Sequence, residues 1–432
     1  MKELRVGIAG FGTVGAGVAD ILAENGELIR QRLGLPVRLT AVADIDTTSD
    51  RGVSLAPGIL TDDLARVVEG PDVDVVVETI GGTGVAYDAV TRALAAGKHV
   101  VTANKALLAS RGADVFAKAA EAGVRLGFEA AVGGGIPVIK ALREGLAANR
   151  ITAVYGIING TTNYILSEMA KTGRPFDAAL AEAKELGYAE PDPTMDISGH
   201  DTAHKIAILA TLAFGTIVGV DDVYVEGITD VSPEDIGYAA EFGYAIKMLG
   251  IAKVSDGRIE VRAHPTLIPS VHLLASVDGV YNAAYVVGDR AGRLMLYGEG
   301  AGRGPAASAV VADIMDIATA LASGAEHAPD ALRLLSPPRD VKPMAQAQCR
   351  YYFRFTTVDQ PGVLGSIAAV LGRRGISIAS VIQKARRAGE TVPIIMLTHE
   401  ALESEVRAAL EEIDALPYAR AKTILMRIEE NE

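Results

Sequence analysis

Five charged side chains fall within sixteen residues of the sequence, in EPDPTMDISGHDTAHK from Glu190 to Lys205. Asp201 and Lys205 are four residues apart, so on a helix they share one face, with the acid ahead of the base. A lysine kept protonated by a carboxylate at the start of an apolar helix can donate a proton to a carbonyl oxygen or steady an alkoxide. A further carboxylate such as Glu190 can bind a substrate ammonium group. The alternative is a surface ion pair that caps a helix.

The same segment also spells H-D-x-x-H, with His200 and His204 four residues apart. This spacing can chelate zinc around a carboxylate base, so a zinc hydrolase is the chief rival interpretation. Against it, no third ligand stands out, and Lys205 adds a repelling charge next to the histidines. A second rival is a non-catalytic amino-acid sensor that uses a nucleotide-binding domain.

Three glycines, Gly10, Gly12 and Gly15, form G-x-G-x-x-G directly after an apolar run and before a helical pattern. The first two let the chain turn and approach a pyrophosphate at the helix N-terminus, and the third permits close helix packing. The position near the start of a βαβ pattern predicts a dinucleotide site. A tight turn without a ligand is the alternative.

Asp44 ends the second predicted strand, where a carboxylate would accept hydrogen bonds from a ribose and repel a 2′-phosphate. No Lys or Arg follows it until Arg51, which favours NAD over NADP. The spacing from Gly15 is longer than the usual ~20 residues, so Asp44 could instead cap a loop and select nothing.

Three further segments have the residue types of ligand sites. Lys105 follows the strand HVVTA, at the end where parallel sheets bind ligands, although an ordinary solvated lysine fits equally. Glu129 and the glycines at 133–135 offer oxygens that suit a hard cation, or a domain hinge. In DQPGVLG at 359–365, free amides could hold a small carboxylate, or the turn only closes the fold.

The elements that must position these residues predict an α/β protein of several domains. β-Branched runs alternate with Ala-rich helical segments over 1–137, which predicts a parallel, Rossmann-type NAD(P)-binding domain with a returning helix at about 303–322. An α+β catalytic and dimerisation domain is expected over 138–302, with a helix after Pro137 and a long helical stretch ending at Gly187. A linker follows at 323–348, and 349–432 reads βαββαβ, the ferredoxin-like order.

Composition excludes several classes of protein. The 432 residues are 49% apolar and 22% charged, typical of a folded chain, and the net charge of −13 argues against nucleic acid or an anionic membrane as the main partner. The longest apolar run, Ile206–Val220, is too short to span a bilayer. The start lacks the pattern of a signal peptide, and Cys349 is the one cysteine, so a cytoplasmic location is expected.

Six motifs in order resemble the homoserine dehydrogenase family: GFGTVG, VTANKALLA, FEAAVGGGIPVI, GIINGTTNYIL, LGYAEPDPTMDISGHDTAHK and GEGAGRGPAASAV. The C-terminal part resembles an ACT domain, and the start at Met1 is similar to the monofunctional form. The resemblance implies NAD(P)-dependent interconversion of aspartate 4-semialdehyde and homoserine, on the branch to threonine, methionine and isoleucine. It also implies feedback by an amino acid at the ACT domain, with threonine the first candidate, and a homodimer or homotetramer.

By resemblance, Lys205 donates the proton to the aldehyde oxygen, and Lys105 lies between nicotinamide and substrate. Substrate contacts are implied for Glu190, Asp201, Asp196 and Thr161. The family's sodium site maps to the Glu129 side chain and to the carbonyls of Val132, Gly134 and Ile136. Backbone contacts to the cofactor are implied for Phe11, Thr13, Val14, Gly187 and Gly302. The chain lacks the basic residue that many relatives carry near Asp44, which again bears on the choice between NADP and NAD.

Overall fold

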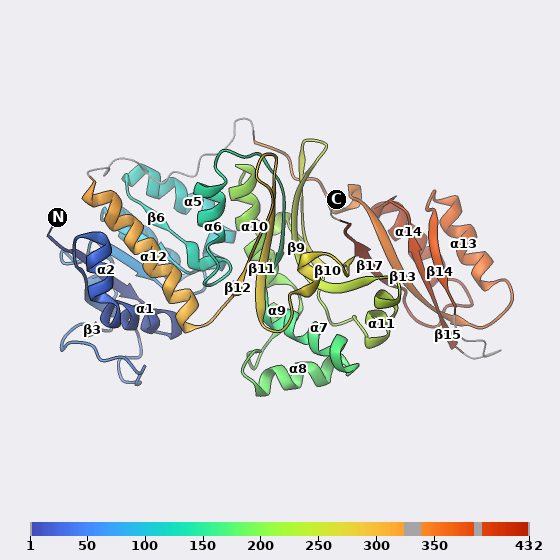
Figure 1. Cartoon of the computed structure of the whole chain (residues 1–432), viewed down its shortest axis with the longest axis horizontal. Coiled ribbons are helices and arrows are strands. Elements are labelled where there is room, and N and C mark those ends of the chain that lie inside the picture. Colours follow the sequence, from blue (N-terminus) through green and yellow to red (C-terminus); the bar gives the residue numbers. More distant parts are fainter. Residues whose placement is uncertain (1, 324–337, 384–390, 431–432) are drawn as a thin grey trace. The chain divides into compact units, whose positions relative to one another are not determined.

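The structure, a computed structural model, describes residues 2–323, 338–383 and 391–430 and divides into two compact units (Figure 1). The first unit comprises Met1–Ile158, His204–Val223 and Tyr281–Arg339. The second comprises Asn159–Ala203, Tyr224–Val280 and Asp340–Glu432. Residues 138–302 contribute to both units, so the predicted domain boundaries stay a prediction. Most of the predicted linker, 324–337, lies outside the described residues.

A six-stranded parallel sheet forms the nucleotide-binding half of the first unit, in the order β3-β2-β1-β4-β5-β6. This confirms the predicted Rossmann-like architecture, in which strand order reverses beside β1. The strands are β1 (Leu4–Ala9), β2 (Val37–Ala43), β3 (Leu60–Thr61), β4 (Val75–Glu78), β5 (His99–Thr102) and β6 (Leu126–Gly127).

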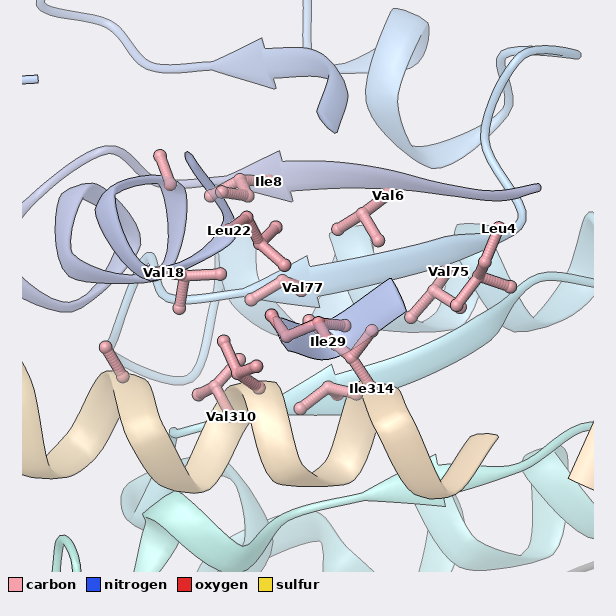
Figure 2. Close-up of a cluster of buried hydrophobic side chains, with 14 of the residues drawn as sticks. Leu4, Val6, Ile8, Val18, Leu22, Ile29, Val75, Val77, Val310 and Ile314 are labelled. Atoms are coloured by element: carbon pink, nitrogen blue, oxygen red, sulfur yellow. The ribbon is translucent and has the colours of Figure 1, made fainter. Parts of the chain in front are cut away.

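Alternate residues of neighbouring strands point into one apolar cluster, because side chains alternate between the two faces of a strand. Figure 2 shows Leu4, Val6 and Ile8 of β1 meeting side chains of the helices that cover this face. These helices are α1 (Thr13–Glu24), α2 (Gly26–Leu33) and the returning α12 (Arg303–Ala322). The remaining helices of this half are α3 (Ala65–Val68), α4 (Val85–Ala95) and α5 (Lys105–Ala122).

Helix α12 packs in the same apolar cluster as α1 and the parallel sheet. It is long and apolar enough to cross a membrane by composition, but half of its apolar window is buried. Val310 and Ile314 pack into the cluster of Figure 2, so its apolar residues belong to the core of the sheet.

The first unit also contains an antiparallel sheet in the order β12-β11-β7. Its strands are β7 (Ile151–Ile157), β11 (Tyr281–Gly288) and β12 (Gly292–Glu299). The helix predicted after Pro137 is present as α6 (Val138–Lys140), which continues as a π-helical turn, Ala141–Gly145.

The second unit is built on a mixed sheet in the order β9-β10-β17-β13-β15-β14, in which β10 and β17 run parallel. The C-terminal elements follow the predicted βαββαβ order, with the two-residue strand β16 (Ala401–Leu402) added beside β13. The bounds are β8 (Tyr224–Val225), β9 (Tyr244–Ser255), β10 (Arg258–Pro269), β13 (Gln348–Val358), α13 (Val363–Arg373), β14 (Ile378–Ile382), β15 (Thr391–Thr398), α14 (Glu403–Asp414) and β17 (Ile424–Ile428).

The helical stretch expected to end at Gly187 is two helices, α7 (Gly160–Thr172) and α8 (Phe176–Glu185). Gly173, with φ of 70°, ends the first one, and Pro175 directly precedes the second. Left-handed glycine is a common helix terminator, so the break has a local cause. The other helices are α9 (Thr194–Ile197) and α11 (Pro233–Glu241), while α10 (His200–Phe214) begins in the second unit and ends in the first.

Candidate active site

The three glycines of the first turn serve three different purposes. Gly10 has φ of 95°, and a side chain there would lie 2.7 Å from the backbone of Thr79. A methyl group at Gly15 would lie 2.1 Å from the Gly10 carbonyl oxygen, so close packing requires glycine. At Gly12 a side chain would meet nothing within 4 Å, which leaves the start of α1 open. An open helix N-terminus is where a pyrophosphate binds in this kind of fold.

Asp44 lies directly after β2 and holds the glycine turn in place. Its carboxylate accepts hydrogen bonds from the Phe11 amide at 2.5 Å and from the Asp46 amide at 2.9 Å. The Asp44 carboxylate therefore does cap the loop, as one of its two interpretations predicts. Because each carboxylate oxygen has more than one lone pair, this contact is compatible with a ribose hydrogen bond. The Phe11 amide, which the resemblance assigned to the cofactor, donates to Asp44 in this structure, whereas Thr13 and Val14 form the first turn of α1.

Lys105 is the first residue of α5, and a buried network fixes that helix start. Asn104 caps the helix by accepting the Leu107 amide at 3.0 Å. Thr102 accepts the Asn104 amide at 3.0 Å and donates to Glu78 at 2.5 Å. Glu78 is fully buried at the carboxyl end of β4. Lys105 thus begins a rigidly held helix at the ligand-binding edge of the parallel sheet.

Lys205 lies in the second turn of α10, and its side chain is nearly buried, with 9% of the residue exposed. Its ammonium nitrogen Nζ donates to the Ile158 carbonyl at 2.6 Å. This hydrogen bond fixes the position of the ammonium group of a nearly buried lysine.

Asn159 follows Ile158 directly in the chain and holds two acidic side chains of the second unit. Its side-chain amide Nδ2 donates to Asp196 at 2.6 Å and to Asp201 at 2.8 Å. Its carbonyl Oδ1 accepts the Thr162 amide at 2.8 Å and so caps α7. One buried asparagine therefore brings together two of the sequence-predicted carboxylates.

The other residues predicted to contact substrate or cofactor lie in loops and at helix ends. Thr161, in the first turn of α7, donates to the Tyr188 carbonyl at 2.7 Å. Glu190 is exposed in the loop that follows α8. Gly187 and Gly302 have φ of 75° and 112°, values that favour glycine. Each backbone turn thus requires its glycine. Among the residues that the structure describes, Glu190 makes no hydrogen bond or ion pair.

The turn around Glu129 supplies oxygen ligands of the kind a monovalent cation prefers. Glu129 is 5% exposed, and its carboxylate accepts the Ile139 amide at 2.9 Å and the Lys140 amide at 2.8 Å. Burial raises the pKa of Glu129 even so. A cation beside this carboxylate would favour its charged form, so the predicted set, Glu129 with the carbonyls of Val132, Gly134 and Ile136, fits such an ion.

The two histidines of H-D-x-x-H lie on α10, where His200 is exposed and His204 is half-buried. Within residues 2–323, 338–383 and 391–430, no three His, Cys, Asp or Glu side chains are grouped so as to hold a metal ion. The two histidines thus lie one turn apart on α10, as their spacing predicts. In the part of the chain that the structure describes, no His, Cys, Asp or Glu side chain completes a metal site with them.

Two residues of the site were missed by sequence reasoning, Glu78 and Asn159. Glu78 is the last residue of the buried strand β4. A single carboxylate at the end of an apolar run could have indicated a site residue in the sequence. Asn159 precedes a helix, which predicts a cap, but its bonds to Asp196 and Asp201 span 37 and 42 residues. No local pattern contains that information.

Comparisons with known proteins agree with the geometry. The family model "Homoserine dehydrogenase" matches residues 137–315, "Homoserine dehydrogenase, NAD binding domain" matches 10–129, and "ACT domain" matches 351–418. Homoserine dehydrogenase of Neisseria gonorrhoeae is 46% identical, with 99% of each chain covered. The crystal structure of a homoserine dehydrogenase from Thiobacillus denitrificans is 46% identical, with a TM-score of 0.93 over 100% of this chain and 99% of that one. That of S. aureus is 31% identical, with a TM-score of 0.77 and 99% of each chain covered.

Proposed function

The chain belongs to the homoserine dehydrogenase family, and we propose that it interconverts L-aspartate 4-semialdehyde and L-homoserine with NAD(P)H. One observation carries the chemical proposal. The Ile158 carbonyl accepts a hydrogen bond from the nearly buried ammonium group of Lys205. Lys205 lies one helical turn after Asp201, and Asp201 accepts a hydrogen bond from Asn159, the residue that follows Ile158. A proton donor and a carboxylate are thereby held at fixed positions on one helix.

In the reducing direction, the bound cofactor supplies a hydride to the aldehyde carbon. Lys205 Nζ donates a proton to the aldehyde oxygen, which becomes the homoserine hydroxyl, and in the oxidising direction it takes that proton back. Nζ has three N–H donors and the Ile158 carbonyl accepts one, so this contact orients the ammonium group. Lys105 assists beside the nicotinamide, at the capped start of α5.

The substrate carries an ammonium and a carboxylate in addition to the reacting carbon. Glu190 and Asp201 bind the ammonium group, together with Asp196, and Thr161 lies close to the substrate. The hydrogen bonds from Asn159 support this assignment, because its neutral amide group orients Asp196 and Asp201. Opposite charge is the simplest means of selecting an amino acid over an uncharged aldehyde.

The cofactor is a nicotinamide dinucleotide on the parallel sheet, held by the turn Gly10–Gly15 with Thr13 and Val14 and by Gly187 and Gly302. Asp44 favours NAD over NADP in this proposal. A monovalent cation, sodium first, binds Glu129 and the carbonyls of Val132, Gly134 and Ile136. The buried Glu129 carboxylate with its raised pKa supports a cation at this turn.

The ACT domain suggests allosteric regulation. We propose that its effector is an amino acid, with threonine the first candidate, and that the enzyme works in the cytoplasm as a homodimer or homotetramer. Nucleic acid and membranes are not expected partners. The net charge of −13 supports both exclusions.

The test is homoserine-dependent reduction of NAD⁺ and NADP⁺, measured in parallel by the absorbance of the reduced nicotinamide, with sodium or potassium present. Replacing Lys205 with Met should lower kcat by about 10²- to 10⁴-fold, the usual effect of removing a proton-transfer group. Lys171→Met is the matched control, because the Lys171 side chain on α7 is 77% exposed. Folded protein that is silent with both cofactors would refute the proposed reaction. A Lys205→Met enzyme that keeps kcat within threefold would refute the role of Lys205.

A further inference from the structure

Glu78 ends the central strand β4, between the two strands that lead into proposed cofactor residues. Its neighbours in register are the last residues of β1 and β5. Strand β1 leads into the glycine turn, and β5 leads into Lys105. The next residue, Thr79, donates its hydroxyl to the Gly10 carbonyl at 2.6 Å. Glu78 therefore lies at the ligand-binding edge of the sheet, between the glycine turn and the helix that Lys105 begins.

The carboxylate of Glu78 accepts hydrogen bonds from two segments at once. Its Oε1 accepts the amides of Ile80 at 2.9 Å and Gly81 at 3.1 Å, in the β4–α4 loop, residues 79–84. Its Oε2 accepts the Thr102 hydroxyl at 2.5 Å, on the side of α5. Glu78 is fully buried, and among the residues that the structure describes no lysine or arginine pairs with it. The two oxygens of one side chain thus bind different segments.

Asn104 connects the same two segments a second time. Its Nδ2 donates to the Gly82 carbonyl at 2.7 Å and to Glu78 Oε1 at 3.4 Å, while its Oδ1 caps the helix that Lys105 begins. Gly81 and Gly82 have φ of 82° and 70°. Two successive glycines give the loop little rigidity of its own. The β4–α4 loop is therefore held to the start of α5 by the Glu78 carboxylate and the Asn104 amide.

We infer that Glu78 is a positioning residue for hydride transfer, which acts by fixing Lys105 relative to the nicotinamide. This inference rests on the proposed function, in which Lys105 assists beside the nicotinamide. Glutamate accepts on both oxygens, whereas glutamine accepts on one and presents an NH₂ donor at the other. If the glutamine carbonyl stays with the loop amides, its NH₂ group faces the Thr102 hydroxyl and disturbs the start of α5. A displacement of about 1 Å near reacting groups can cost about 10²-fold in rate.

The test is a double-mutant cycle of Glu78→Gln and Lys105→Met in the full chain. Glu78→Gln should lower kcat for homoserine oxidation by about 10- to 100-fold. The dissociation constant of NADH, measured by fluorescence titration without turnover, should stay within threefold, because the loop amides keep an acceptor. In the Lys105→Met background, Glu78→Gln should lower kcat by less than threefold, because its effect passes through Lys105.

A primary deuterium isotope effect reports on the hydride step itself. The substrate is homoserine deuterated at the carbon that bears the hydroxyl group. In Glu78→Gln the isotope effect on kcat should be at least as large as in the native enzyme, because a misplaced Lys105 slows hydride transfer. An isotope effect below the native value would place the loss in another step and overturn the inference.

Two further variants separate positioning from a general loss of structure. Thr102→Val keeps the side-chain volume and removes the hydroxyl that Glu78 accepts, so kcat should fall at least fivefold with the NADH dissociation constant again within threefold. This variant keeps the inference testable if thermal unfolding shows that Glu78→Gln folds poorly. Glu69→Gln is the matched control, because the Glu69 side chain is 49% exposed, and its kcat should stay within twofold of native.

Four results in an active native enzyme would overturn the inference alone. They are a kcat within threefold of native in folded Glu78→Gln or in Thr102→Val, an equal loss from Glu78→Gln in the Lys105→Met background, an NADH dissociation constant that rises as much as kcat falls, and an equal loss in Glu69→Gln. A native enzyme that reduces neither cofactor with homoserine would instead refute the proposed function, and the inference with it.

Discussion

Asn159 illustrates how one side chain can serve both structure and chemistry. Its carbonyl caps α7, while its amide group binds Asp196 and Asp201. An asparagine suits this position because it has both a donor and an acceptor. An aspartate would keep the cap and lose the donor. The position of the substrate carboxylates thus depends on the amide nitrogen.

Replacing Asn159 with Asp should raise the KM for homoserine at least tenfold. A third carboxylate would face Asp196 and Asp201, and like charges at hydrogen-bond distance repel. Because the helix cap is retained, kcat and the melting temperature should change less than KM. Steady-state kinetics and thermal unfolding separate these effects. Asn25→Asp, at an exposed position after α1, is the control. An unchanged KM would show that Asn159 acts only as a cap.

Asp44 is the second residue whose role can be measured directly. Its carboxylate already binds the Phe11 and Asp46 amides, so Asn at this position keeps an acceptor and removes the negative charge. Asp44→Asn should raise the ratio of kcat/KM for NADP⁺ over NAD⁺ by about tenfold, because the repulsion of a 2′-phosphate is lost. Parallel assays with the two cofactors measure the ratio. A ratio within twofold of the native value would reduce Asp44 to a loop cap.

Strands β10 and β17 are joined by buried charges as well as by backbone pairing. Arg262 binds Glu260 at 2.9 Å and Glu429 at 2.6 Å, and Arg427 binds Glu403 at 2.5 Å and Glu226 at 2.7 Å. Both arginine side chains are 1% exposed. Removing one member of such a group destabilises the fold strongly, because a buried charge then loses its partner.

The pKa directions of these carboxylates predict acid unfolding. Burial by itself would raise the pKa of Glu226, Glu403 and Glu429, but the neighbouring cations outweigh it and hold each pKa below its usual value. The unfolded chain, with glutamate pKa values of about 4.3, therefore binds more protons than the folded protein in acid. The contribution of these three carboxylates to the free energy of unfolding should stay constant above about pH 5 and fall steadily below it. Urea denaturation at several pH values, followed by circular dichroism, measures this.

Replacing Arg427 with Met should lower the free energy of unfolding of the second unit by about 3–5 kcal/mol at pH 7, because it removes the buried cation and leaves Glu226 and Glu403 with only the partly exposed Arg407. Their pKa values should rise, so the loss of stability in acid should become smaller. Arg290→Met, with a side chain 83% exposed, should change stability by less than about 0.5 kcal/mol. A cost below about 1 kcal/mol for Arg427→Met would contradict the interpretation.

At the scale of the whole molecule, the ACT domain is an integral part of the second unit. Its last strand, β17, pairs with β10, and Glu429 just beyond it binds Arg262. A chain that ends at Gln346 should therefore melt at a lower temperature and aggregate, because it exposes the edge of β10 and removes a partner of a buried arginine. Light scattering and thermal unfolding test this. A monodisperse truncated chain with the native melting temperature would show that the ACT domain is only attached.

Local patterns determine much of the molecule. Alternating β-branched and Ala-rich segments predict the parallel sheet, Gly10, Gly12 and Gly15 predict the nucleotide turn, and the i, i+4 spacing places Asp201 and Lys205 on one helix, as observed. These features depend on residues close together in the chain, where backbone geometry and periodicity act directly.

Tertiary structure alone decided which partners meet across long separations. The bonds of Asn159 to Asp201 and of Lys205 to Ile158 span 42 and 47 residues, and the pairing of Arg262 with Glu429 spans 167. The run RIEVRAH alternates like a half-exposed strand, yet β10 is buried along nearly its whole length, and its Arg262 pairs there with Glu260 and with the distant Glu429. A charged residue can be buried when distant segments of the chain supply its partners. The local sequence pattern around the residue does not show which distant segments these are.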